Sequence, residues 1–148
     1  MPLIAEDPYG LERFVEAQRG VHADALAELR AGRKRSHWMW FVFPQLAGLG
    51  VSASAQHYGI RGVDEAGAYL AHPVLGVRLR ECAQALLALR GRSAEQIFGF
   101  PDVLKLRSSM TLFAAVPGAD AVFGEVLARY YDGEPDARTL HLLALAGG

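Results

Sequence analysis

Residues 73–89, with the sequence PVLGVRLRECAQALLAL, give the clearest helix signal in the chain. Apolar side chains recur there every three or four positions, which places them in one stripe along a helix: Leu75, Leu79, Cys82, Leu86 and Leu89. The charged and amide side chains of the segment mostly lie off that stripe. The pattern predicts a long amphipathic helix whose apolar stripe faces the protein interior.

Helix start and stop signals flank this segment on both sides. Asp64 is the expected cap of a helix that ends at His72, because the residue before a proline is disfavoured in helical geometry. Ser93 and Gln96 have the spacing of a capping box. Together with 73–89, the helices we predict cover residues 11–18, 22–31, 64–71, 93–98, 102–116, 119–131 and 136–145.

These segments predict an all-α or mainly α fold. We expect a compact single-domain bundle of about seven or eight helices over residues 1–148, with its core at roughly 11–145 and room for one short strand pair. The only alternation typical of a strand lies in HWMWFVF, residues 37–43.

Composition narrows the class of protein. Of the 148 residues, 51% are hydrophobic and 21% charged, which is typical of a folded domain. The formal net charge of -1 argues against a dedicated nucleic-acid binder, since such proteins are usually strongly basic. A single cysteine, Cys82, excludes an internal disulfide and is expected to lie in the core. No signal peptide or membrane span is apparent, so we expect a cytoplasmic protein with no membrane partner.

The most unusual stretch is SHWMWFVFPQ, residues 36–45, which follows the basic run RKR. As a helix it would place Trp38 and Gln45 on one side, and as a strand His37 would share a side with Phe43. Both tryptophans are core residues in one interpretation, with their indole N–H groups bonded to neighbours. In the other, an indole lines a pocket with Arg35 at its rim, because cations beside aromatic faces suit a planar anionic ligand. Four residues of this stretch are therefore candidate ligand contacts: His37, Trp38, Trp40 and Gln45.

A second candidate stretch is DVLKLRSSMTLF, residues 102–113. On a helix, Lys105 lies one turn before Ser108 and Ser109. A desolvated lysine beside a serine could activate the hydroxyl as a nucleophile, or the three side chains could contact a phosphate. Alternatively, the hydroxyls bond back to helix carbonyls while Lys105 extends to solvent.

The third candidate stretch is ERFVEAQ, residues 12–18. Glu12 and Glu16 are one helical turn apart and could form an acid–base pair if both reached one pocket. A pair of this kind is otherwise a solvated helix face. Gln18 lies among apolar residues and is a further candidate ligand contact.

The established catalytic and cofactor motifs are missing. The chain has no phosphate-binding loop, dinucleotide-binding glycine motif, zinc-protease motif or nucleophile elbow. Its five histidines are scattered along the sequence. We therefore expect neither a metal site nor a bound cofactor, and whether the protein is an enzyme stays open.

Four strings together resemble the bacterial domain of unknown function 1810 family: RFVEAQ, ALAELRAGRKRSHWMWFVFPQLAGLG, YLAHPVLGVRLREC and LKLRSSMTLF. The resemblance extends over roughly residues 11–130. It implies a small, mainly helical cytoplasmic protein whose family has no established activity. Some members carry the automatic label calpastatin, but calpain inhibitors act through disordered segments, which this composition does not match.

A more distant similarity is to the NADAR proteins, which are N-glycosidase-like enzymes acting on ADP-ribose-type conjugates. It rests on the order of ERFVEAQ, AHPVLGVRLRECAQALL and QIFG. The similarity implies that Glu12 activates water while the tryptophan and lysine stretches hold base and phosphate. The chain departs from that family because it lacks the basic C-terminal motif and because HWMWFVFPQ has no counterpart there.

The sequence thus predicts a pocket for a nucleotide-like or other planar anionic molecule. Glu12 and Lys105 are its candidate catalytic residues. Two other functions stay open, which are a NADAR-like N-glycosidase and a non-catalytic interaction module. We expect a monomer or a homodimer, and no nucleic-acid partner.

Overall fold

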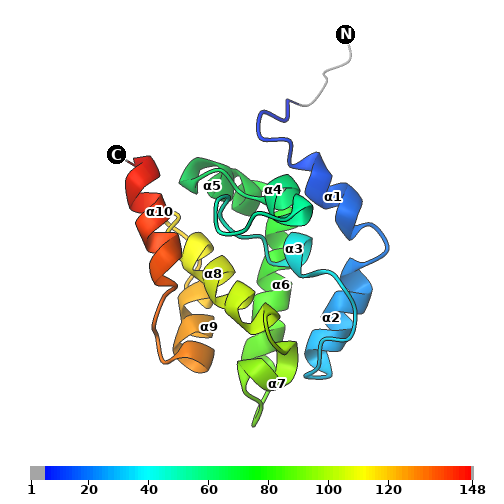
Figure 1. Cartoon of the computed structure of the whole chain (residues 1–148). Helices are drawn as coiled ribbons and strands as arrows, with labels where there is room; N and C mark the ends of the chain where they lie inside the picture. Colours follow the sequence, from blue (N-terminus) through cyan, green and yellow to red (C-terminus); the bar gives the residue numbers. More distant parts are fainter. Residues whose placement is uncertain (1–5, 148) are drawn as a thin grey trace.

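The computed structural model describes residues 6–147, and its longest helix, α6 (Leu75–Ala88), occupies the predicted segment. The helix lies between α2 (His22–Arg30) and α9 (Val122–Tyr131), with α5 (Val63–Ala71) against it as well (Figure 1). Helix α6 begins two residues after Pro73. His72 fixes this start, because its Nδ1 accepts hydrogen bonds from the backbone N–H groups of Val74 and Leu75 at 3.1 and 3.2 Å.

Residues 6–147 contain ten helices, so the mainly helical fold class is confirmed. The other six are α1 (Glu12–Gln18), α3 (Met39–Val42), α4 (Ala53–Tyr58), α7 (Ala94–Phe98), α8 (Asp102–Ala114) and α10 (Ala137–Gly147). Helices α3 and α4 are the two that the sequence analysis did not predict. Instead of a strand pair, residues 6–147 hold one isolated parallel bridge between Leu46 and Ile60.

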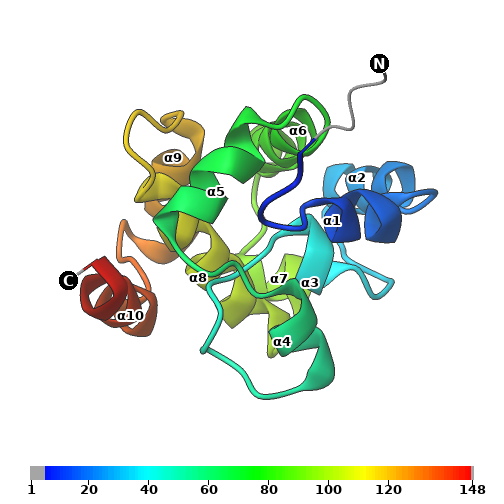
Figure 2. The same ribbon diagram turned by 90° about the horizontal axis from the view of Figure 1, so that it is seen from above.

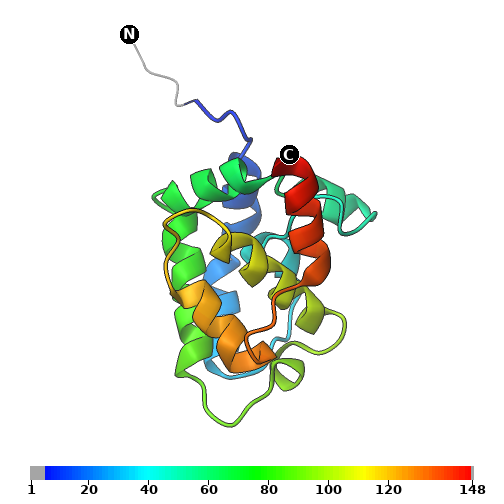
Figure 3. The ribbon, with the colours of Figure 1, turned by 90° about the vertical axis from the view of Figure 1, so that its left-hand side faces the viewer.

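The helices gather around α6 and α8. Viewed from above, α1 and α2 lie on one side of the molecule and α9 and α10 on the other (Figure 2). Turned by 90°, the structure shows α9 and α10 in front of α8, which packs against both (Figure 3). Within residues 6–147, no helix has both the length and the hydropathy that crossing a membrane requires.

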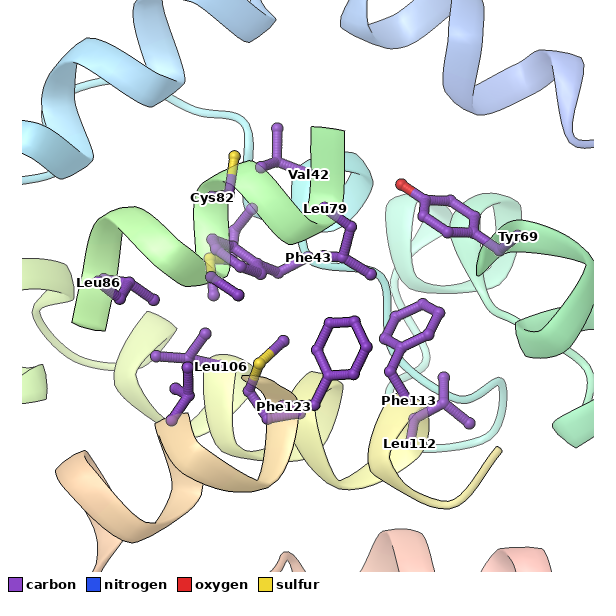
Figure 4. Packing of buried hydrophobic residues seen from close by; sticks show 14 of the residues in the cluster. Val42, Phe43, Tyr69, Leu79, Cys82, Leu86, Leu106, Leu112, Phe113 and Phe123 are labelled. Carbon is purple, nitrogen blue, oxygen red and sulfur yellow. The ribbon is translucent and has the colours of Figure 1, made fainter. Parts of the chain in front are cut away.

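The core is built from side chains of the central helices (Figure 4). Tyr69 of α5, Phe113 of α8 and Phe123 of α9 form a chain of rings with centroid separations of 5.3 and 5.8 Å. Cys82 is fully buried in this cluster, as predicted. Burial raises the pKa of its thiol to about 12, so the sulfur behaves as an apolar core atom.

Capping was predicted correctly at α7 and wrongly at α5. The Ser93 hydroxyl accepts from the Gln96 N–H at 3.1 Å, and the Gln96 side chain accepts from the Ser93 N–H at 2.8 Å. Helix α5 instead begins at Val63, with Gly62 at its cap position, so Asp64 lies inside the first turn. There the carboxylate still interacts favourably with the helix dipole.

Helices α5 and α6 meet at a corner that only glycine fits. A Cβ atom on Gly76 would lie 2.1 Å from the carbonyl oxygen of Leu70 and 2.8 Å from its carbonyl carbon. Both obstacles are backbone atoms, which cannot move without shifting α5. The absence of a side chain at Gly76 therefore sets how closely the two helices approach.

We predict that Gly76→Ala lowers the free energy of unfolding by about 1–3 kcal/mol, because the methyl group forces α5 away from α6. Gly124→Ala in α9 is the matched control, since no atom of residues 6–147 lies within 4 Å of a Cβ placed there. It should stabilise the protein by about 0.5–1 kcal/mol through its effect on the unfolded chain. Urea unfolding of both variants tests the contrast, and an equal effect at the two positions would contradict it.

Candidate functional site

The two tryptophans of residues 36–45 have different environments. Trp38 precedes the single turn of α3 and is 1% exposed, and its indole N–H donates to Oε1 of Glu28 at 3.0 Å. Trp40, two residues later, is only partly buried. Trp38 is thus a core residue with a satisfied N–H, as in the first interpretation of this stretch, and Trp40 is the indole that lines a pocket.

Glu28 of α2 holds the start of this stretch in place. Its carboxylate accepts hydrogen bonds from the Arg35 N–H at 2.6 Å and from the N–H and hydroxyl of Ser36 at 3.0 and 2.6 Å, besides the Trp38 indole. Burial alone would raise the pKa of this carboxyl. The hydrogen bonds from Ser36, Arg35 and Trp38 outweigh that effect and lower the pKa to about 2.

Asp102, the first residue of α8, is shared by two lysines. Lys34 Nζ lies 2.8 Å from one carboxylate oxygen, and Lys105 Nζ lies 3.0 Å from the other. Burial acts to raise the pKa of Asp102, but the two ammonium groups prevail and lower it. Each ammonium also lies over an indole, Lys34 at 5.1 Å from the centroid of the Trp38 ring and Lys105 at 4.2 Å from that of Trp40.

A pocket of about 330 Å³ opens beside Trp40 and Lys105. Its walls come from α3 and the segment that follows it, from the first half of α8 and from the start of α10. The lining residues are Trp40, Gln45, Leu49, Gly50, Pro101, Leu104, Lys105, Ser108, Asp136 and Arg138. Arg138 closes one side, because its guanidinium donates to the carbonyls of Gly48 and Leu49 at 3.3 and 3.4 Å.

The pocket lining holds hydrogen-bond donors on Gln45, Lys105 and Arg138 and one carboxylate, that of Asp136. The Gln45 side chain is buried, and its Nε2 has no hydrogen-bond partner within residues 6–147. One oxygen of Asp136 is already engaged, since it accepts from the N–H and hydroxyl of Thr139 at 2.9 and 2.6 Å. Ser108 donates to the Leu104 carbonyl at 3.2 Å. Such a wall favours a ligand rich in acceptor atoms.

Comparison with known proteins identifies the family. The model of the family described as "Protein of unknown function (DUF1810)" matches residues 8–143. The chain belongs to the DUF1810 family. A crystal structure of the conserved hypothetical protein Rv1873 from Mycobacterium tuberculosis is similar to this DUF1810 protein at 57% identity and a TM-score of 0.91. The match covers 93% of this chain and 99% of that one.

The resemblance to this family inferred from the sequence is therefore confirmed. No curated protein matches the DUF1810 chain. The more distant NADAR similarity is not shown by the family match or by the structural one.

The pocket brings together four of the candidate residues of this DUF1810 protein and separates the others. Trp40, Gln45, Lys105 and Ser108 line it. Glu12 lines a different pocket of about 450 Å³, together with Tyr9 and His72 among others. Arg35 and His37 are exposed on the loop between α2 and α3.

Two further candidates are buried in the DUF1810 fold. Ser109 is fully buried, and its hydroxyl has no partner among the described residues. Gln18 is 2% exposed, and its amide donates to the Phe41 carbonyl at 2.7 Å and to the Tyr69 hydroxyl at 3.1 Å while accepting from Arg78 at 3.3 Å. Gln18 thus satisfies polar groups between α1, α3, α5 and α6.

Asp136 and Arg138 are pocket residues that the sequence analysis missed. They stand at the start of α10, about 30 residues beyond Lys105 in the sequence. The only local signal was Asp136 as a helix start, which indicates a cap rather than a ligand site. The contact of Arg138 with Gly48 and Leu49 depends on how α10 packs.

We predict that Glu28→Gln removes a pH-dependent part of the stability of this DUF1810 protein. The folded pKa of about 2 lies below the ordinary value of 4.5, so the charged carboxylate stabilises the fold above about pH 5 and this contribution is lost between about pH 5 and 2. Near neutral pH the free energy of unfolding of the variant should be about 1–3 kcal/mol lower, because a neutral amide forms weaker hydrogen bonds than a carboxylate. Thermal melts of both proteins between about pH 2 and 7 measure the difference, and a gap that stays constant over this range would contradict the assignment.

Proposed function

We propose that the pocket beside Trp40 binds a small planar molecule that carries an anionic group, of mononucleotide size or smaller. The observation that carries the proposal is the Gln45 Nε2, which is buried without a hydrogen-bond partner within residues 6–147, on a residue that lines the pocket together with Lys105 and Arg138. A buried donor without an acceptor costs about 1–3 kcal/mol, and a ligand acceptor would recover that cost.

Lys105 has the capacity to hold an anion without leaving its present partners. An ammonium group has three N–H donors, and Asp102 accepts from Lys105 at 3.0 Å. The remaining donors are available to a phosphate or carboxylate. The Lys105 ammonium lies 4.2 Å from the centroid of the Trp40 ring, and this cation–π interaction helps to fix its position.

The size and apolar walls of the pocket define the rest of the ligand. Small-molecule sites span roughly 300–1,000 Å³, and the pocket lies near the lower limit. Leu49, Leu104 and the Trp40 indole provide apolar surface for a flat ring. A mononucleotide or a small aromatic phosphate or carboxylate fits this description better than a molecule as large as ADP-ribose.

The arrangement supports binding more than catalysis. Lys105 is ion-paired, and the Ser108 hydroxyl donates to a helix carbonyl, so the pair shows no nucleophile–base hydrogen bond. A NADAR-like reaction would need Glu12 to act beside the tryptophan and lysine stretches. Glu12 lies in another pocket, which leaves that alternative without its catalytic carboxylate.

The interaction-module alternative is also less well supported. It would use residues 36–45 as an exposed aromatic contact surface. Trp38, Met39, Val42 and Phe43 are each at most 3% exposed, so most of that surface is inside the protein. If the module alternative holds, size-exclusion chromatography should show a dimer whose stability does not depend on the pocket residues.

We expect isothermal titration to show that AMP binds more tightly than adenosine, because only AMP offers a phosphate to Lys105 and Arg138. Lys105→Met, which keeps the apolar stem, should weaken AMP binding by about 10- to 100-fold. Arg19→Met is the matched control, since Arg19 is exposed and ion-paired to Glu16, and neither residue lines the pocket. Equal loss in both variants, or no AMP binding at millimolar concentration, would refute the proposal.

Gln45→Leu should separate binding from stability. Removing an unpartnered buried amide is expected to stabilise the free protein by about 1 kcal/mol, while AMP binding weakens because a donor is lost. Gln18→Leu is the control, because Gln18 is also buried but is hydrogen-bonded through both amide atoms, and its loss should destabilise the fold. Chemical unfolding and titration of both variants test the pair, and destabilisation by Gln45→Leu would show that the amide is satisfied in solution.

A further inference from the structure

The arginines without partners are concentrated at one end of the molecule. Of the 15 lysines and arginines, all but four have a side-chain hydrogen bond or ion pair within residues 6–147. The four exceptions are Arg30, Arg33, Arg35 and Arg90, and all of them are exposed. Eleven cations are therefore engaged with other groups of residues 6–147, and these four have no side-chain partner there.

These four residues come from two segments that the fold holds together. Arg30, Arg33 and Arg35 lie at and beyond the end of α2, and Arg90 lies in the loop after α6. Arg92 of that loop donates to the Gly32 carbonyl at 3.0 Å, and the Lys34 N–H donates to the Ile97 carbonyl at 2.7 Å. Figures 1 and 3 show the end of α2 and the α6–α7 loop at the same lower end of the molecule.

We call the surface formed by Arg30, Arg33, Arg35, Arg90 and Arg92 the arginine face. Residues 28–35 and 90–95 contain six cations and the two carboxylates Glu28 and Glu95, a formal net charge of +4, and one of the six cations, Lys34, is already paired with Asp102. The whole chain has a net charge of -1, so the rest of it carries -5. The net charge of the chain is therefore small only because positive and negative charges in different parts of it nearly cancel.

The exposed residues around the arginine face are small or polar. Within the two segments they are Ala31, Gly91, Ser93 and Glu95, and the exposed Ser36 and His37 follow directly. Among the residues whose burial the structure describes, the exposed large apolar ones lie elsewhere in the sequence: Val51, Val77, Phe100, Leu104, Leu140 and Leu145. Protein–protein interfaces have an apolar or aromatic centre, whereas nucleic-acid interfaces are more polar and strongly basic.

We propose that the arginine face binds the phosphate backbone of a nucleic acid, without reading its sequence. Guanidinium groups match phosphate oxygens with two parallel hydrogen bonds, and the four unpartnered arginines have these donors available. This inference does not depend on the ligand of the pocket. It departs from the expectation drawn from the total net charge, which took no account of where the charges lie.

Fluorescence anisotropy with a labelled duplex of about 20 base pairs tests the proposal. If four phosphates are neutralised, log K should fall against log salt concentration with a slope of about -3 to -4 between about 50 and 200 mM. The triple variant Arg33→Gln, Arg35→Gln and Arg90→Gln should reduce that slope to about -1 and weaken binding at low salt by more than tenfold. These side chains have no partner in the described part of the chain, so the variant should fold, which its circular dichroism melt verifies.

Arg19→Gln is the matched control, because it removes one exposed positive charge far from the arginine face in sequence. It should leave the slope unchanged. Absence of binding at about 50 mM salt, or equal binding by the triple variant, would overturn the proposal. Equally strong competition by poly-glutamate would also overturn it, because the face would then recognise carboxylates rather than a phosphate backbone.

Discussion

The carboxylate of Asp102 determines how the aromatic stretch is placed. It ties the loop after α2 to the first turn of α8 through Lys34, and it positions Lys105 on the pocket wall. Only 8% of the Lys34 side chain is exposed. Removing one member of a buried ion pair leaves an uncompensated charge at a cost of about 3–5 kcal/mol. Without Asp102, Lys34 and Lys105 would both lose their carboxylate partner.

Long periodic segments of the chain could be predicted because their burial follows from spacing alone. The apolar stripe of residues 73–89 needs only a helical period to be recognised, and Leu75, Leu79, Cys82 and Leu86 are all buried. Helix α3 gives no such signal because it is a single turn. The residues that lead into it are held by Glu28, ten residues before Trp38, and by Asp102, which lies far along the chain. These contacts are tertiary and have no local pattern.

The candidate site could likewise be predicted only where its residues are close together in the sequence. Lys105 and Ser108 share a wall because they are one helical turn apart. Trp38 and Trp40 have the same residue type and nearly the same neighbours in sequence, so no periodicity could show which one is in the core. Arg138 reaches the pocket only through the packing of α10 on the segment after α3. The order of the sequence motifs places Glu12 with these residues, but motif order does not specify how far apart side chains lie in the fold, and Glu12 lines another pocket.

The sharing of Asp102 between two lysines has a thermodynamic consequence. Lys34 belongs to the basic segment at the end of α2, and Lys105 belongs to the pocket, so both regions draw on one negative charge. An anion that binds Lys105 would weaken its attraction to Asp102 and so strengthen the pairing of Asp102 with Lys34. An anion that binds Lys34 would likewise strengthen the pairing of Asp102 with Lys105. Linkage requires this coupling to be reciprocal. The carboxylate of Asp102 thus links the charge balance of the pocket wall to that of the loop after α2.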